Sequence, residues 1–303
     1  MEKLYSPATI QRIKDKYGFR LSKSLGQNFL ADGNIVNRII EGSNIEKTDL
    51  VVEIGCGIGV LTAAAAEAAA KVIGIEIDYN LMPVLQETLS EYDNIEIINR
   101  DFLKTDLNEI INQAYGGNKY AFSSVKIIGN LPYYITTPII MKVLEEQKTD
   151  VPAPDSMTVM LQKEVADRIA AGPGSKIYGA ISVAVQYYCN VENVISVPKE
   201  VFIPKPKVDS AVIRLEIRKN TPVELMDKDV FFTVIKSGFG QRRKTLLNAL
   251  TGTYGLDKEE IKAVLAQSDI DPARRAETLD INEFAALANA VFRGIREREK
   301  KGD

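Results

Sequence analysis

Short apolar runs alternate with amphipathic stretches between residues 50 and 217. The runs are rich in Val and Ile and predict strands, whereas the apolar spacing between them predicts helices. Such alternation is typical of βαβ crossovers and predicts an α/β fold, in which helices cover both faces of a parallel sheet. No long helix separates the last two strands, so an antiparallel hairpin is expected at one sheet edge. The strands are predicted over 50–54, 71–77, 95–99, 125–129, 157–161, 192–197 and 209–217, and the helices over 60–70, 79–91, 106–114, 137–146, 163–170 and 178–188.

The pattern changes after Arg218, where strand-like alternation ends and helical stretches begin. Asp257 with Glu260 and Asp280 with Glu283 have the spacing of capping boxes, with Asp at the cap. We therefore predict two domains: an α/β domain over 1–219 and a small all-helical domain over 220–303. A length of 303 residues agrees with two domains at about 150 residues each.

Composition excludes several classes of protein and of site. Apolar residues make up 45% of the chain, but no apolar run is long enough to span a bilayer, and no secretory signal precedes residue 25. Two cysteines cannot form a disulfide framework, so a reducing cytoplasm is expected. The complete lack of histidine excludes His-based triads, His-ligated zinc and a His general base. We expect no metal site and no membrane partner.

Charge is unevenly distributed although the net charge is only −3. A negative sum argues weakly against a nucleic-acid partner. However, the segment 236–244 contains four basic residues and no acidic one. Arg242, Arg243 and Lys244 are therefore candidate RNA contacts, with a solvated helix face as the alternative.

A glycine-rich turn, Glu53-Ile-Gly55-Cys-Gly57-Ile-Gly59, follows the first predicted strand. Glycines allow positive φ and close approach of the backbone to a ligand. Glu76 ends the second strand, where a carboxylate can accept both hydroxyls of a ribose. A nicotinamide or flavin site and an S-adenosylmethionine site both fit this pattern. The G-x-G-x-G spacing and the lack of a hydride-transfer site favour S-adenosylmethionine, and a purely structural turn is the third alternative.

The third strand ends at Asn99-Arg100-Asp101-Phe102. Ligands of doubly wound sheets bind at the carboxyl ends of the strands. We therefore expect Asp101 to accept from the adenine amino group of the cofactor, with Phe102 beside the ring. An Asp after a strand is often a helix cap, but Asp106 with Glu109 is placed to cap the next helix.

The tetrapeptide Asn130-Leu131-Pro132-Tyr133 follows the fourth strand and suits methylation of an exocyclic amino group. The Asn130 side-chain oxygen and the Leu131 carbonyl would hold the two amino hydrogens. Pro132 would fix the backbone, and Tyr133 would stack on a flipped base. This chemistry needs no general base, because the methylated product loses its proton to water. A structural Asn-Pro turn is the alternative.

Two further segments complete the predicted site. Residues 24–30 form a polar and apolar patch that is expected to cover the cofactor. Phe202-Ile-Pro-Lys205-Pro-Lys207 leads into the last strand. Phe202 is expected to stack opposite Tyr133, with a core position as the alternative, and Lys205 and Lys207 are candidate phosphate contacts.

Six motifs together resemble the ribosomal RNA adenine N6,N6-dimethyltransferases, over residues 20–293. The resemblance is strongest to the bacterial enzymes that dimethylate two adjacent adenosines near the 3′ end of 16S rRNA. It implies a Rossmann-like sheet, S-adenosylmethionine contacts at Asn28, Leu30, Gly55, Glu76, Asp101 and Asn130, and a monomer acting on immature small subunits. Gly57 belongs to the same turn. The motifs are Gln27-Asn28-Phe29-Leu30, Glu53 to Gly59, Asn130 to Ile135, Phe202 to Ser210, Phe239 to Lys244 and Arg275 to Leu279.

Other functions are less consistent with these motifs. Macrolide-resistance methylases of 23S rRNA share the cofactor site but typically have Ile where Leu131 stands, and their tail is shorter. A DNA adenine methyltransferase would need a sequence-reading insertion, and a cytosine C5 enzyme a Pro-Cys nucleophile, which neither Cys56 nor Cys189 provides. A binding protein without activity should lose the acceptor tetrapeptide, which is present here.

Overall fold

The computed structural model describes residues 3–18, 25–118, 120–148 and 150–302. The chain divides into two compact units, each described by itself. Unit 1 comprises Met1–Ala166 with Asn190–Ile217, and unit 2 comprises Asp167–Cys189 with Arg218–Asp303.

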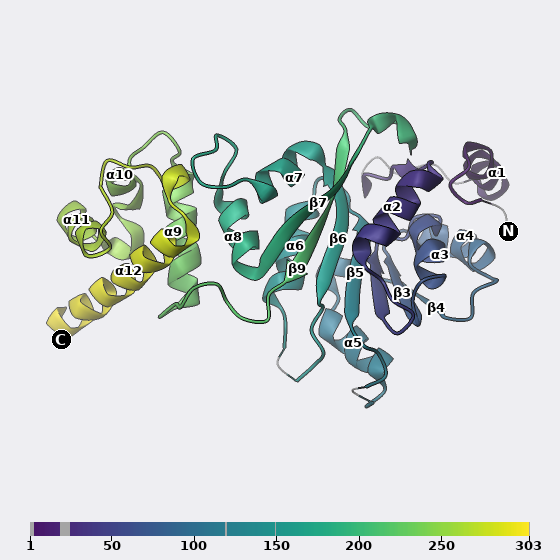
Figure 1. The fold of residues 1–303 in the computed structure, drawn as a ribbon, viewed down its shortest axis with the longest axis horizontal. Helices are drawn as coiled ribbons and strands as arrows, with labels where there is room; N and C mark the ends of the chain where they lie inside the picture. Colours follow the sequence, from purple (N-terminus) through teal and green to yellow (C-terminus); the bar gives the residue numbers. More distant parts are fainter. Residues whose placement is uncertain (1–2, 19–24, 119, 149, 303) are drawn as a thin grey trace. The chain divides into compact units, whose positions relative to one another are not determined.

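Unit 1 is built on a seven-stranded sheet with the order β4-β3-β2-β5-β6-β9-β7 (Figure 1). The strands from β4 to β6 pair in parallel, and β9 runs antiparallel to β6. The last two strands lie side by side at the edge, as the sequence predicts. The bounds are β2 (Leu50–Ile54), β3 (Lys71–Glu76), β4 (Ile95–Asn99), β5 (Val125–Asn130), β6 (Ser156–Gln162), β7 (Cys189–Val197) and β9 (Ser210–Ile217).

Both faces of this sheet are buried, which explains the continuous apolar runs of its central strands. Val51 packs in a cluster with α2, α3 and α4, while Val52 points to the opposite face and is equally buried. Helices α5 and α6 bury apolar residues of their own and lie on that opposite side. The bounds are α2 (Gly33–Ser43), α3 (Val60–Ala66), α4 (Met82–Thr88), α5 (Leu107–Tyr115), α6 (Thr136–Glu145) and α7 (Lys163–Ala170).

Strand predictions are confirmed to within a few residues, whereas two helices are shorter than predicted. Helix α3 ends at Ala66, and Ala70 already donates its N–H to the Asp49 carbonyl as the chain enters β3. The predicted helix over 79–91 begins as the 3-10 turn η2 (Tyr79–Leu81). Pro83 at the start of α4 has no N–H to continue the helical bonding.

Three features of unit 1 were not predicted: helix α1, helix α2 and a second, two-stranded sheet. Helix α1 (Pro7–Tyr17) packs Ile10 and Ile13 into the core cluster. A second sheet joins β1 (Phe29–Leu30) to β8 (Phe202–Ile203), which follows the turn η4 (Lys199–Val201). Strands this short escape detection by periodicity.

Unit 2 is helical, as predicted, and has its own apolar core. Both predicted capping boxes form, because Asp257 and Asp280 each exchange hydrogen bonds with the Glu three residues later. Its elements are α8 (Ala180–Tyr188), α9 (Lys228–Gly240), α10 (Leu246–Leu250), η5 (Thr253–Gly255), α11 (Lys258–Gln267), η6 (Ala276–Thr278) and α12 (Ile281–Gly302).

The division of the chain differs from the predicted boundary between residues 219 and 220. Residues 167–189 group with the helical unit. The reason is packing, since Tyr178 and Tyr187 are buried in the same cluster as Phe231 and Phe284. Tyr187 contacts the Phe231 ring at 5.3 Å between centroids. Within the described ranges, no helix combines the length and apolar character needed to cross a bilayer.

Candidate active site

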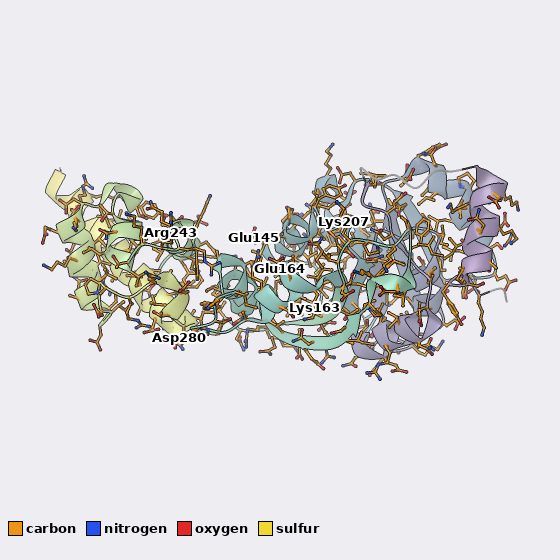
Figure 2. All side chains as sticks on the ribbon, turned by 90° about the horizontal axis from the view of Figure 1, so that it is seen from above. Glu145, Lys163, Glu164, Lys207, Arg243 and Asp280 are labelled. Carbon is orange, nitrogen blue, oxygen red and sulfur yellow. The ribbon has the colours of Figure 1, made fainter. Side chains whose placement is uncertain are left out.

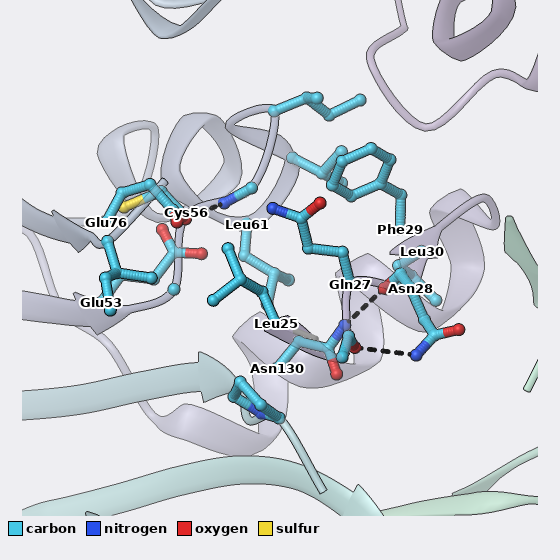
Figure 3. Close-up of a pocket in the computed structure, with 17 residues that line it drawn as sticks. Leu25, Gln27, Asn28, Phe29, Leu30, Glu53, Cys56, Leu61, Glu76 and Asn130 are labelled. Carbon is cyan, nitrogen blue, oxygen red and sulfur yellow. Dashed lines mark hydrogen bonds between the residues drawn. The ribbon is translucent and has the colours of Figure 1, made fainter. Parts of the chain in front are cut away.

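The glycine turn connects β2 to α3 at the carboxyl end of the sheet. Gly55 and Gly57 have φ of +81° and +57°, values that other residues adopt only with strain. In this conformation Gly57 points its N–H at Glu76, and the distance to Oε2 is 2.9 Å. The turn and Glu76 line a cavity with about 700 Å³ of empty space (Figure 3).

Glu76 is buried at the end of β3, and each of its carboxylate oxygens accepts one backbone hydrogen bond. Oε2 accepts from Gly57 and Oε1 accepts from the Asp78 N–H, also at 2.9 Å. Each carboxylate oxygen has two lone pairs, so each retains the capacity for a ligand hydroxyl. Burial raises the pKa of Glu76, while the two backbone donors oppose that shift.

Glu53, the first residue of the glycine-rich motif, is a second buried carboxyl group in the wall of this cavity. It is 1% exposed and accepts from the Thr62 hydroxyl at 2.5 Å. Burial raises the pKa of Glu53 to about 8, although the Thr62 hydroxyl opposes the shift. The side chain is therefore largely protonated at neutral pH.

Asp101 lines a second cavity, with about 440 Å³ of empty space, together with Phe102. The two cavities share four lining residues and therefore adjoin: Leu25, Gly55, Ile77 and Pro132. Asp106 caps α5 as expected. However, Asp101 is itself a cap, because its Oδ1 accepts from Leu103 N at 3.0 Å at the start of the turn η3 (Phe102–Lys104).

Asn28 and Leu30 line the first cavity from the side opposite the glycine turn. The Asn130 Nδ2 donates to the Asn28 carbonyl at 2.9 Å, and the Asn28 Nδ2 donates to the Gly26 carbonyl, also at 2.9 Å (Figure 3). The first of these bonds fixes the orientation of the Asn130 amide, because only its nitrogen can donate to a carbonyl. The Asn130 oxygen is therefore the end that remains for a ligand.

The acceptor tetrapeptide begins where β5 ends. Gly129 is required there, because a Cβ at this position would lie 2.6 Å from the Ile54 carbonyl oxygen of β2. The side chain of Leu131 is buried and its N–H donates to Met160 at 3.0 Å, which anchors the peptide whose carbonyl was predicted to bind substrate. Pro132 lines both cavities. The Tyr133 hydroxyl lies 2.7 Å from the Ser210 hydroxyl, so that β9 fixes its ring.

Phe202 lies in β8, where it pairs with Leu30 of β1. Its side chain is 3% exposed and packs in the core cluster of unit 1. Stacking of Phe202 on a substrate base stays a prediction, and its ring offers little free surface in this structure. Lys207 is exposed on unit 1 (Figure 2). Lys205 is also exposed and pairs with Glu200 at 2.6 Å.

The three predicted RNA contacts of unit 2 differ in their surroundings. Arg242 donates to the carbonyls of Lys176 and Tyr178, at 2.7 and 3.1 Å, and lies 3.6 Å from Glu277. Its guanidinium therefore holds a loop of unit 2. Arg243 and Lys244 are exposed, and Figure 2 shows Arg243 on the surface of this unit.

The structure thus places most of the predicted cofactor and acceptor residues around two adjoining cavities of unit 1. The cavities are also lined by four residues that were not among the predicted site residues: Glu53, Cys56, Ile77 and Tyr134. Tyr134, 59% exposed, had a signal, since it directly follows the acceptor tetrapeptide. Glu53 also had a signal, as an acidic residue directly before the glycine turn. Cys56 and Ile77 had none, because an apolar or small residue beside a strand end is usually a core residue.

Comparisons with known proteins agree with this geometry. The family model for ribosomal RNA adenine dimethylase matches residues 18–290. The ribosomal RNA small subunit methyltransferase A of Alkaliphilus oremlandii is 52% identical, over 97% of this chain and 100% of that protein. The protein of the same name from Clostridioides difficile is 49% identical, over 96% and 98%.

Solved structures show the same fold over most of the chain. A dimethyladenosine transferase from Plasmodium falciparum superposes with a TM-score of 0.71 at 26% identity, covering 90% of this chain and 98% of that one. The 23S rRNA methyltransferase ErmE gives a TM-score of 0.64 at 25% identity, covering 87% and 99%. The extent of the family match and the identity to its bacterial relatives show that this chain belongs to the ribosomal RNA adenine dimethylase family.

Proposed function

We propose that this protein transfers methyl groups from S-adenosylmethionine to N6 of two adjacent adenosines near the 3′ end of 16S rRNA, in immature small subunits. The observation that carries the proposal is the fixed amide of Asn130, the first residue of the acceptor tetrapeptide, which lines the same cavity as Glu76. Membership of the dimethylase family supports the reaction class. We expect the protein to act as a monomer in the cytoplasm.

The residues present fit S-adenosylmethionine. The free lone pairs of Glu76 suit the two ribose hydroxyls, and the Asp101 Oδ2 suits the adenine amino group in the adjoining cavity. Gly55, Gly57, Asn28 and Leu30 would bound the remainder of the molecule. When bound, the cofactor supplies an electrophilic methyl group.

The acceptor residues would hold the exocyclic nitrogen of adenine. The Asn130 oxygen and the Leu131 carbonyl each accept one amino hydrogen, which favours pyramidal nitrogen and frees its lone pair. The Asn28 carbonyl keeps Asn130 in the accepting orientation. Tyr133 would stack on the base, and burial raises the pKa of its phenol, which therefore stays protonated during turnover.

RNA would be bound through exposed cations of both units. Lys207 on unit 1 and Arg243 and Lys244 on unit 2 are exposed and suit phosphate contacts. Arg242 would act indirectly, by holding the loop of unit 2 at Lys176 and Tyr178.

The test is the transfer of labelled methyl from S-adenosylmethionine to small-subunit particles that lack the modification, followed by nucleoside analysis. We expect N6,N6-dimethyladenosine in the 3′ region of 16S rRNA, and no product with fully modified particles. Large subunits serve as a second control, since labelling of 23S rRNA alone would overturn the substrate assignment. Absence of any transfer would overturn the proposed reaction.

A further inference from the structure

Gln27 lines the first cavity and is hydrogen-bonded to a residue outside the predicted site. Its Nε2 donates to the Asp78 Oδ2 at 2.8 Å. Gln27 belongs to the segment that leads into β1, and Asp78 lies two residues after Glu76, the last residue of β3. Figure 3 shows the Gln27 amide directed away from Asn28 and Asn130.

Asp78 is a rigid acceptor for this bond. It is 7% exposed, and its own N–H donates to the Glu76 Oε1 at 2.9 Å. Its Oδ1 accepts from the Asn80 backbone and side-chain nitrogens at 3.1 and 3.0 Å. The position of Asp78 therefore depends on Glu76, the residue assigned to the ribose.

The other end of this connection is the acceptor site. Gln27 precedes Asn28, whose carbonyl accepts from the Asn130 Nδ2 and whose side chain donates to Gly26. A shift of this backbone would remove the bond that orients Asn130. The amide would then be free to turn its nitrogen towards the substrate, where an amino group meets a donor instead of an acceptor.

We propose that Gln27 is a positioning residue, which through Asp78 holds the Asn28 carbonyl in register with the ribose-binding carboxylate and so keeps Asn130 oriented for methyl transfer. This inference rests on the proposed function. Gln27 would act without touching the adenine amino group, and its loss should lower the transfer rate as well as the affinity for the cofactor.

The test exchanges donor and acceptor across the bond. Gln27→Glu places a carboxylate against Asp78, and the adjacent like charges break the contact. Gln27→Glu combined with Asp78→Asn restores it with the direction reversed, because the new amide at position 78 can donate to the carboxylate at position 27 and still accept from Asn80. The net charge of the chain is unchanged in the double variant.

Three quantities are measured: cofactor affinity by calorimetry, the single-turnover methyl-transfer rate at saturating cofactor, and the melting temperature. We expect Gln27→Glu to lower the rate about tenfold or more, the effect of losing one hydrogen bond to a charged group. The double variant should recover most of that loss.

The matched control is Gln11, which donates to Asp15 at 2.8 Å on the exposed face of α1. Gln11→Glu introduces the same like-charge contact away from the site and should leave rate and affinity unchanged. The inference is overturned if Gln27→Glu transfers methyl at the wild-type rate, or if the double variant is no faster than the single one at equal melting temperature. Failure of the wild type to bind S-adenosylmethionine would instead overturn the proposed function.

Discussion

Glu76 has two tasks, because the same carboxylate that faces the cavity also holds the glycine turn and Asp78. We expect Glu76→Ala to lower the affinity for S-adenosylmethionine about tenfold or more, since an unsatisfied buried partner costs about 1–3 kcal/mol. Calorimetry measures the change, and circular dichroism checks that the fold is retained. The affinity of Glu76→Gln, which keeps one acceptor oxygen, should lie between those of the wild type and Glu76→Ala. Equal affinity in all three proteins would place the ribose elsewhere.

Glu53 links stability to pH. Its pKa of about 8 in the folded protein lies above that of the unfolded chain, so its contribution to stability is complete below about pH 4.5 and is lost as the pH rises through 8. Glu53→Gln keeps the acceptor for Thr62 without the charge. We expect the melting temperature of the variant, relative to wild type, to be several degrees higher at pH 9 than at pH 5, because each unit of difference between the folded and unfolded pKa corresponds to about 1.4 kcal/mol. A difference independent of pH would show that Glu53 does not titrate in this range.

Asn130 should affect the chemical step more than substrate binding. With no histidine in the chain, the single-turnover rate should vary little between about pH 6 and 7.5, below the titration of Glu53. Asn130→Ala should lower this rate more than it lowers the affinity for RNA, because the acceptor bond strengthens as the nitrogen becomes pyramidal. Asn94→Ala serves as the control, since this amide donates to the Ala66 and Ala69 carbonyls, at 3.0 and 3.3 Å, and lines neither cavity. A near-normal rate for Asn130→Ala would refute the assigned acceptor site.

Among the elements, the segment between α9 and α10 contains two exposed basic residues, Arg243 and Lys244, and one, Arg242, that is hydrogen-bonded to backbone carbonyls. Replacing Arg243 and Lys244 by Gln should flatten the salt dependence of RNA binding by about 0.7 log units for each lost phosphate contact. Arg242→Gln should instead lower the melting temperature, because Arg242 holds the Lys176 and Tyr178 carbonyls. Filter binding from low to high salt measures the slopes. An unchanged slope in the double variant would identify these residues as solvated surface.

Elements with long periodic patterns could be predicted from sequence, and elements fixed by distant contacts could not. The strands from β2 to β9 follow their apolar runs, apart from the two-residue β8. Helix α1 was not predicted, although Pro7 at its first turn and Gly18 after its end are typical of helix ends. In the structure Gly18 has a φ of +62°. The bond between Gln27 and Asp78 joins residues 51 positions apart, and nothing local in either residue indicates it. Likewise, the capping role of Asp101 depends on a 3-10 turn that has no periodicity.

At the scale of the whole molecule, the helical unit consists of two chain segments. A fragment starting at residue 220 would lack Tyr178, Val183 and Tyr187, which belong to its core. We expect that fragment to be poorly folded. A fragment in which a short Gly-Ser linker joins 167–189 to 218–303 should fold cooperatively. The two ends to be joined already lie close together, because Arg218 N donates to the Tyr188 carbonyl at 2.8 Å. Thermal melting followed by circular dichroism compares them, and two equally cooperative transitions would show that 167–189 is dispensable.

The small sheet of β1 and β8 affects how the cavity forms while the chain is being synthesised. It pairs Leu30, which lines the first cavity, with Phe202, so this part of the cavity wall is supported by a strand that is synthesised long after it. A nascent chain that has released only its first six strands contains every parallel strand of the large sheet but lacks the partner of β1. We therefore expect the wall of this cavity at Leu30 to become ordered only after β8 has been synthesised, late in the translation of the chain.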